Sequence, residues 1–318
     1  MRLDPFLLLL LGAAGIGTFL PATGDGLDVV KVAATVTIGL LFFLYGTRLS
    51  TAETLRNLRH WKLQLAIMLT TFAFFPALGL GVRLLPEAVV PSPLTAGVLL
   101  LCLVPSTVQG CVVYTRIARG NTAAAVVSAS MSNLVGVFLV PLYVALLMGG
   151  DAHVDGGAVL RIVAQLFAPF VAGQLVRPLI GRWVERNDGW LKRFDRSTIL
   201  LVVYVAFSEG AEADIWTAVP ASSFAIVAAI CAVLLAVALT WTTLLGRWCR
   251  FERPDRMALL FCGSTKSLAS GLPMVAVLFP GSTAALIVLP LMIYHQMQLL
   301  VSSVLAERLG RTAPDDDA

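Results

Sequence analysis

Long apolar segments follow one another over nearly the whole chain, and this feature constrains the fold more than any other. A helix needs about 20 mostly apolar residues to cross the hydrocarbon core of a bilayer. Ten segments come close to this requirement, near residues 4–20, 29–49, 62–82, 94–118, 122–147, 158–177, 198–216, 221–246, 257–279 and 284–306. Each is expected to be helical, because a chain in hydrocarbon must satisfy its own backbone hydrogen bonds. The sequence therefore predicts an all-α integral membrane protein with ten transmembrane helices.

The low charge content supports a lipid environment. Charged residues make up only 13% of the 318 residues, against roughly 25% in an average soluble domain. The net charge of +4 does not indicate a nucleic-acid partner, because the cations lie in the connections between apolar segments. The five cysteines have neither the spacing of a zinc site nor that of a disulfide framework, so no resident cofactor is expected.

Lysine and arginine mark one side of the membrane. Connections rich in these residues alternate with connections that have almost none, and 19 of the 23 lie at the termini or in every second connection. Cytoplasmic connections carry such an excess. The pattern predicts a multi-pass protein of the plasma (inner) membrane with both termini in the cytoplasm. In the alternative interpretation the first segment is a cleaved signal peptide, which would leave nine helices.

Ten helices divide into two halves of five. Because five is odd, the second half enters the membrane in the opposite orientation, which is the arrangement of an inverted repeat. The predicted units are a first five-helix repeat over 1–148, a second over 158–306 and a cytoplasmic tail over 307–318.

Polar residues interrupt the fourth and ninth segments near mid-membrane. The fourth contains Pro105-Ser106-Thr107, and the ninth contains Gly263-Ser264-Thr265-Lys266-Ser267. Interrupted helices in corresponding positions of two halves point to a transporter's binding site. Alternatively, these hydroxyls only bond within their own helices or tighten helix contacts. We predict broken fourth and ninth helices, with these candidate substrate- or ion-binding residues: Ser106, Thr107, Gln109, Gly263, Ser264, Thr265, Lys266 and Ser267.

Lys266 is the most unusual of these residues. A charged side chain near the middle of a bilayer is costly unless it meets a partner or water. Its ammonium is predicted to face the crossing of the broken helices, as a built-in cation or as the partner of an anionic substrate. A buried amine is also a candidate proton carrier. The alternative is a structural ammonium bound to carbonyls at helix C-termini.

Other polar residues also lie deep in the predicted helices. Glu209 is a candidate cation or proton site and a candidate partner of Lys266; alternatively, it is an outer carboxylate beside Glu212 and Asp214. His295 in the tenth segment is a further candidate. Ser130, Ser132 and Asn133 are the candidates in the fifth segment, although such residues often serve only to join helices.

Four motifs carry a resemblance to a known family. They are Leu44-Tyr45-Gly46-Thr47-Arg48-Leu49-Ser50, Val104-Pro105-Ser106-Thr107-Val108-Gln109, Phe261-Cys262-Gly263-Ser264-Thr265-Lys266-Ser267-Leu268 and Ile293-Tyr294-His295-Gln296. With the ten segments and the two interruptions, they resemble the bile acid:sodium symporter superfamily, in particular its sodium/bile acid cotransporter 7-like branch. The resemblance covers nearly the whole chain.

The resemblance implies a core domain that holds the two crossing helices, a smaller panel domain, and alternating access between them. It assigns the candidates of the fourth, fifth and ninth segments to a site in the core. Sodium-coupled members place a glutamate and then a Gln-Asn pair around the ninth-helix crossing, where this chain has Cys262, Ser264, Thr265 and Lys266. Lys266 is therefore expected to replace a bound sodium ion, and coupling to sodium, to protons or to neither stays open.

The leading interpretation is a secondary transporter of a small organic anion. The alternative is a membrane regulator of calcium homeostasis that transports nothing. An intramembrane hydrolase built from Ser270 and His295 is disfavoured, because Leu268 stands where rhomboid-type sites have glycine. The chain also has no phosphate-binding loop, so an ATP-driven pump is not expected. The protein is not expected to be an enzyme. Its substrate and oligomeric state do not follow from the sequence.

Overall fold

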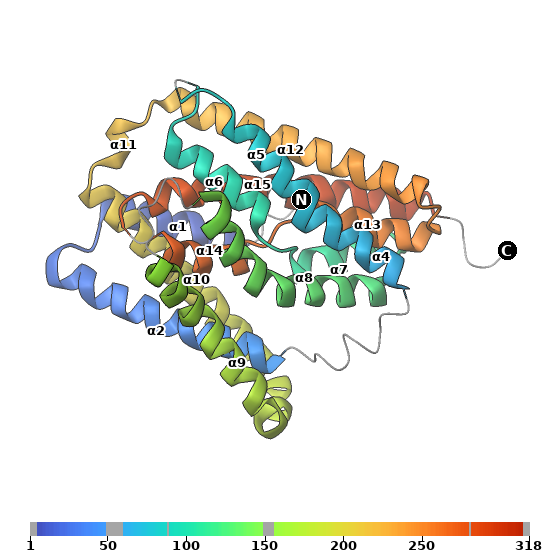
Figure 1. The fold of residues 1–318 in the computed structure, drawn as a ribbon, viewed down its shortest axis with the longest axis horizontal. Helices are drawn as coiled ribbons and strands as arrows, with labels where there is room; N and C mark the ends of the chain where they lie inside the picture. Colours follow the sequence, from blue (N-terminus) through green and yellow to red (C-terminus); the bar gives the residue numbers. More distant parts are fainter. Residues whose placement is uncertain (1–4, 49–59, 88, 149–155, 280, 314–318) are drawn as a thin grey trace.

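The fold of this computed structural model is helical throughout the part that it describes, which comprises residues 5–48, 60–87, 89–148, 156–279 and 281–313. No strand occurs within these ranges (Figure 1). In chain order the elements are α1 (Pro5–Phe19), α2 (Gly24–Arg48), α4 (Trp61–Leu69), η2 (Thr70–Phe74), α5 (Phe75–Arg83), α6 (Ser92–Leu103), α7 (Val108–Ile117), α8 (Thr122–Tyr143), η3 (Val144–Met148), α9 (Gly156–Arg186), α10 (Asp188–Glu212), α11 (Ile215–Ala218), α12 (Ala221–Trp248), α13 (Arg253–Ser264), α14 (Leu268–Leu278) and α15 (Ala284–Arg311).

Several helices are long and apolar enough to cross a membrane. They are Gly24–Arg48, Trp61–Arg83, Thr122–Met148, Ser222–Trp248 and Ala284–Arg311, and the bent pair α6 and α7 is a sixth candidate. The prediction of an all-α membrane protein is thus confirmed. The segments predicted at 4–20, 158–177, 198–216 and 257–279 are also helical, although length and composition do not single them out as spans within the described ranges.

Some predictions concern residues outside the described ranges. Three arginines of the predicted charge pattern lie there, namely Arg2, Arg56 and Arg59. So do residues 149–155, which separate the predicted repeats, and residues 314–318 of the predicted tail. The last helix is longer than predicted, because α15 continues past residue 306 to Arg311. An ion pair one turn apart, between Glu307 and Arg311 at 3.9 Å, accompanies this extension.

The helices pack in two groups. The four-helix group consists of α1, α2, α9 and α10, in which α2 lies along α9 and α1 along α10 (Figure 1). The larger group consists of α4 to α8 and α12 to α15, in which α6 packs against α5 and α15, and α12 packs against α13. Contacts of α10 with α14 and α15, and of α9 with α8, join the two groups.

Helix α6 lies inside the larger group. Every residue from Gly97 to Leu103 is buried, which fits a helix that is apolar on all sides. Gly97 allows the close approach of α15, because a Cβ atom there would lie 2.5 Å from the carbonyl oxygen of Ile287. The C-terminal end of α6 is therefore held in the interior of the protein.

Glycines also set the packing of the four-helix group. A Cβ atom on Gly46 of α2 would lie 2.1 Å from the Phe170 oxygen, and one on Gly173 of α9 would lie 2.1 Å from the Phe43 oxygen. Small residues let membrane helices approach so closely that their backbones touch. The helices α2 and α9 therefore cross at these two glycines.

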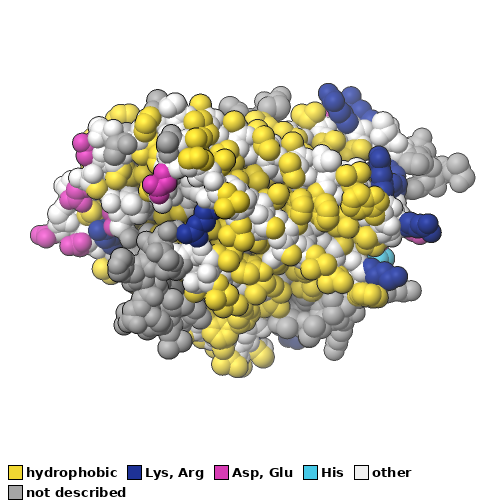
Figure 2. Space-filling model, turned by 45° about the horizontal axis from the view of Figure 1, so that its top comes forward, with side chains coloured by type: hydrophobic (Ala, Val, Ile, Leu, Met, Phe, Trp, Pro, Cys, Tyr) yellow, Lys and Arg dark blue, Asp and Glu magenta, His cyan; other side chains and the backbone are white. Residues whose placement is uncertain are grey.

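The outer surface has the character of a membrane protein. Figure 2 shows a broad area of hydrophobic side chains, with most of the visible Lys and Arg at one end and the visible Asp and Glu towards the other. Exposed apolar side chains include Val36, Leu179 and Val233, which are 65%, 84% and 62% exposed. A water-soluble monomer rarely exposes such a large contiguous apolar surface. The chain is therefore an integral membrane protein.

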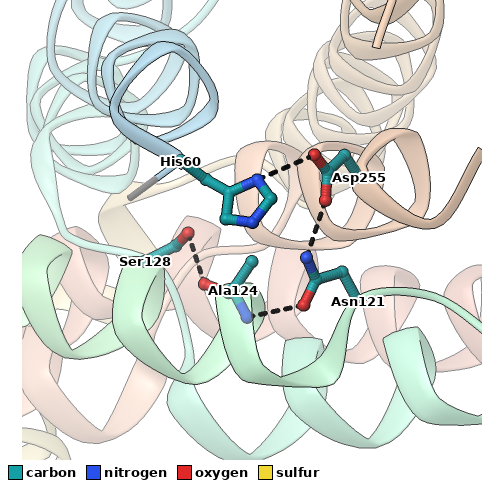
Figure 3. A network of polar contacts seen from close by, with 5 residues as sticks. All are labelled: His60, Asn121, Ala124, Ser128 and Asp255. Atoms are coloured by element: carbon teal, nitrogen blue, oxygen red, sulfur yellow. Dashed lines mark hydrogen bonds and ion pairs between the residues drawn. The ribbon is translucent and has the colours of Figure 1, made fainter. Parts of the chain in front are cut away.

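A polar network joins three helices at the end rich in Lys and Arg. The Asp255 carboxylate accepts a hydrogen bond from Asn121 Nδ2 at 2.7 Å and lies 3.2 Å from His60 Nδ1 (Figure 3). The Asn121 Oδ1 atom caps α8 by accepting from the N–H of Ala124 at 2.9 Å. The network thus ties the starts of α4, α8 and α13 together.

Candidate substrate-binding cavity

The chain leaves the helical conformation between α6 and α7. Helix α6 ends at Leu103 and α7 begins at Val108, and the two are bent by 58°. Val104 and Thr107 have extended backbones. Pro105 has no N–H to donate to the preceding turn, which favours a break of the helix at this point.

A second interruption separates α13 from α14. Helix α13 ends at Ser264, and Thr265 and Ser267 are extended. The Ser267 hydroxyl caps α14 by accepting from the N–H of Ser270 at 3.1 Å. A serine in this position satisfies one of the free N–H groups at a helix start.

The two interruptions contact each other. The N–H of Ser267 donates to the Pro105 oxygen at 2.8 Å, and the Ser106 hydroxyl donates to the carbonyls of Cys262 and Thr265. Helix α8 completes this junction, because Asn133 Nδ2 donates to the Ser106 oxygen at 2.9 Å. Ser132 Oγ accepts from the N–H of Ser106 at 3.0 Å.

Lys266 holds the same junction from its buried side. Its side chain is fully buried, and Nζ donates to the carbonyl oxygens of Thr71, Cys102 and Val104 at 3.2, 3.0 and 2.9 Å. The ammonium also lies 4.0 Å from the ring centroid of Phe75. The structural alternative considered for this lysine, an ammonium bound to carbonyls at a helix C-terminus, describes these contacts.

The three carbonyls are available to Lys266 for backbone reasons. Cys102 and Val104 lie at the end of α6, where helical partners run out. Thr71 lies in the π-helical turn, in which the N–H of Phe75 donates to Thr70 instead. The next residue along is Pro76, which has no N–H. One lysine therefore satisfies three carbonyls that the helices leave unpaired.

The main chain of Lys266 also makes hydrogen bonds, through both its N–H and its carbonyl. Gln298 of α15 accepts from its N–H at 2.7 Å and donates to its carbonyl at 2.8 Å. Tyr294 donates to the Ser264 carbonyl at 2.7 Å. These bonds fix the extended stretch against α15.

A cavity of about 610 Å³ lies between the two helix groups. The larger group contributes polar side chains beside the interruptions, and the four-helix group contributes charged ones. Apolar residues, among them Phe42, Phe170 and Met274, line the space between. The polar and charged lining residues are Tyr45, Arg48, Thr107, Gln109, Tyr114, Ser130, Asn133, Lys192, Asp195, Arg196, Ser267, Ser270 and His295.

The predicted site residues divide into three sets. Those that line the cavity are Thr107, Gln109, Ser130, Asn133, Ser267 and His295. Those buried outside its lining are Ser106, Ser132, Gly263, Ser264, Thr265 and Lys266. Glu209 belongs to neither set and pairs with Lys31 at 2.8 Å, between α10 and α2. Lys266 binds carbonyls and not Glu209.

Sequence reasoning missed the charged wall of the cavity. Arg48 and Asp195 form an ion pair at 2.5 Å between α2 and α10, and Lys192 and Arg196 lie beside them in the lining. Arg48 belongs to the first of the four motifs, but the sequence indicates it only as a cytoplasmic charge. The signal that could have found it is its place at the end of an apolar segment, three residues after Tyr45 and two after Gly46.

Sequence reasoning also missed one hydroxyl of the cavity lining. Ser270, considered only for a hydrolase, donates to Asn133 Oδ1 at 2.7 Å and accepts from Ser267 Oγ at 3.0 Å. These three side chains form a row along the cavity wall.

A helical membrane protein with a cavity between two helix groups and two interrupted helices beside it has the general architecture of a transporter. Comparison with known proteins agrees. Residues 4–311 match the SBF-like CPA transporter family, and the chain belongs to that family.

Named relatives extend this result. The chain is 44% identical over 314 residues to an uncharacterised protein of Pseudomonas aeruginosa, PA2026, which covers 98% of this chain and 94% of the relative. It is 44% identical over 312 residues to Escherichia coli YfeH, which carries the provisional name of symporter, and this match covers 97% of this chain and 93% of the relative. It is 30% identical over 315 residues to rat sodium/bile acid cotransporter 7, and this match covers 96% of this chain and 92% of the relative. The predicted resemblance is confirmed.

Proposed function

We propose that this protein is a secondary transporter that moves a small organic anion across the plasma (inner) membrane by alternating access. The observation that carries the proposal is the cavity between the two helix groups, whose walls come from both. A binding site that two rigid groups share can open to either side when one group tilts against the other.

The helix order supports an arrangement of ten spans in two inverted repeats. In this arrangement the first repeat (1–148) contains α1, α2, α4 to α5, α6 to α7 and α8. The second (158–306) contains α9, α10, α12, α13 to α14 and α15. The interrupted pair is the fourth member of each half. The four-helix group would then be the panel domain and the larger group the core domain.

The charges of the cavity favour an anion. Arg48, Lys192 and Arg196 line it together with a single carboxylate, Asp195, among the described residues. A cavity with excess positive charge and apolar walls raises the local concentration of anions that have an apolar body. The charge distribution in Figure 2 supports cytoplasmic termini, with the Lys and Arg end in the cytoplasm.

Lys266 bears on the coupling ion. Its ammonium supplies a fixed positive charge at the junction of the two interruptions. We propose that this charge takes the place of one transported sodium ion. Uptake would then need no sodium at this site.

Uptake into proteoliposomes tests the proposed function. The probes are radiolabelled cholate and 4-phenylbutyrate, measured with and without sodium and pH gradients. We expect uptake above that of protein-free vesicles, and a loss of about tenfold in Gln109→Ala, whose side chain lines the cavity.

The matched control is Gln296→Ala, a glutamine on α15 outside the cavity lining, which should transport as the unmodified protein does. Absence of uptake for both probes would overturn the proposal and favour a regulator that carries nothing. Uptake that depends on sodium and is undiminished in Lys266→Ala would contradict the role given to that lysine.

A further inference from the structure

Two ion pairs join α2 to α10, one towards each end of the helices. Lys31 pairs with Glu209 at 2.8 Å, and Arg48 pairs with Asp195 at 2.5 Å. Only the second pair belongs to the lining of the cavity. Each pair joins a cation of α2 to a carboxylate of α10, so the first is an internal control for the second.

The Arg48 pair is incompletely satisfied. Nη1 donates to Asp195 Oδ2, whereas Nε and Nη2 are shielded from water and have no hydrogen-bond partner among the described residues. Within the same part of the chain, the other carboxylate oxygen, Asp195 Oδ1, is also buried without a partner. A buried donor without an acceptor is costly, and most of all on a charged group.

The unused donors have a defined geometry. Nε and Nη2 lie on the same edge of the planar guanidinium, and together they form the fork that binds both oxygens of a carboxylate. Asp195 occupies a different edge through Nη1. Arg48 therefore retains one bidentate position while it is paired.

The surroundings of Arg48 carry more positive than negative charge. Lys192 and Arg196 line the same part of the cavity, and the acid nearest to Lys192 is Asp188, at 2.5 Å one turn away. The Arg196 guanidinium lies 5.4 Å from the ring centroid of Phe6. This excess of positive charge favours the binding of a second carboxylate, in addition to that of Asp195, next to Arg48.

We propose that Arg48 is the anchor for the carboxylate of the transported anion, and that the anion engages the Nε and Nη2 fork when the guanidinium turns towards the cavity. Asp195 orients the guanidinium through Nη1 and weakens the attraction by its own negative charge. This inference rests on the proposed function, because it names the side chain of the four-helix group that holds the transported anion.

Binding to purified protein tests the assignment. Cholate and 4-phenylbutyrate are titrated calorimetrically, together with 4-phenylbutyramide, which has the same body without the charge. In the unmodified protein a carboxylate should bind more tightly than the amide. Arg48→Gln should weaken carboxylate binding by about tenfold or more, and Arg48→Lys should also weaken it, because lysine keeps the charge but lacks the fork.

The direction in which Asp195→Asn changes the affinity for a carboxylate decides between an anchor and a structural ion pair. It removes the competing negative charge and leaves Arg48 in place, so it should tighten carboxylate binding about threefold to tenfold. A purely structural ion pair would instead weaken binding in both variants. The matched controls, Lys31→Gln and Glu209→Gln, break the other pair of the same two helices and should leave binding unchanged.

The outcomes separate the two proposals. Unchanged carboxylate binding in Arg48→Gln, or weaker binding in Asp195→Asn, would overturn the anchor while the unmodified protein still binds and transports the probes. If the unmodified protein neither binds nor transports either carboxylate, the organic-anion function itself fails, and the anchor with it. If Arg48→Gln does not fold, Arg48→Lys and Asp195→Asn still decide the question.

Discussion

A single buried side chain ties the stretch between α13 and α14 to two other helical elements. Lys266 binds the carbonyls of Thr71, Cys102 and Val104, which lie in the π-helical turn and at the end of α6. Membrane interiors offer such carbonyls no water, so an unpaired one is costly. The lysine is therefore a structural residue of the junction, whatever else its charge does.

Replacement of this lysine should destabilise the protein. Lys266→Met keeps much of the volume but leaves three buried carbonyls unpaired, at about 1–3 kcal/mol for each group. We expect a clearly lower midpoint of thermal unfolding in detergent. The control is Lys62→Met, at an exposed lysine, which should unfold as the unmodified protein does. An unchanged midpoint in Lys266→Met would contradict the structural role.

The sequence could identify the interrupted stretches but not the direction in which each side chain points. In an extended backbone, successive side chains alternate between opposite sides. Residues 265–267 place Ser267 at the cavity and Lys266 behind it. The phase of this alternation depends on how α13 packs, which no local pattern reveals. Lys266 was expected to face the crossing of the broken helices; its ammonium binds carbonyls there, on the side away from the cavity lining.

At the scale of helices, apolar length predicted where they lie but not their irregularities. The segment at 62–82 was predicted as one helix and is one, yet it contains the π-helical turn that frees the Thr71 carbonyl. Such a turn depends on tertiary contacts as well as on the nearby Pro76. The partner of that carbonyl could not be predicted without it.

The glycine contact between α2 and α9 gives a second prediction. Gly173→Ala would place a Cβ atom 2.1 Å from the Phe43 carbonyl oxygen, so the helices must separate at a cost of about 1–3 kcal/mol. The thermal midpoint should fall. Gly181→Ala is the control on the same helix, because the one atom near its added Cβ is the Arg177 Cγ, at 3.5 Å. Equal midpoints in the two variants would refute the close contact.

The network at Asp255 gives a third prediction. Asp255→Ala removes the acceptor that Asn121 and His60 share, and it should lower the thermal midpoint by the equivalent of about 1–2 kcal/mol. Glu252→Ala, at the exposed N-cap of the same helix, makes no side-chain cap bond and should have little effect. A larger loss in Glu252→Ala would show that charge near the helix start matters more than the network.

At the scale of the whole molecule, orientation can be tested with a native thiol. Cys249 is exposed at the C-terminal end of α12, between Arg247 and Arg250, whereas the other four cysteines are buried. With cytoplasmic termini, a membrane-impermeant maleimide should label Cys249 in inverted vesicles but not in intact cells. Thr217→Cys in a Cys249→Ser background, an exposed position at the opposite end, should give the reverse pattern. Labelling of Cys249 in intact cells would invert the proposed topology.

The sequence predicted the class of the whole molecule from apolar length and the positions of charge, because both are set by the bilayer. It did not predict which charges face each other across the protein. Arg48 and Asp195 are 147 residues apart in the chain, and their pairing follows from the packing of α2 on α10. The charged wall of the cavity therefore emerged only from the fold.

The two ion pairs between α2 and α10 also limit how the four-helix group can move. They connect α2 and α10 at two levels, at Lys31 and at Arg48. A shift of one helix along the other by a single residue, about 1.5 Å, would lengthen or distort both ion pairs at once. Sliding within the group is thus resisted, so the displacement proposed for transport would be a rocking of the whole unit. The surface on which it would rock is the contact of α9 and α10 with α8, α14 and α15.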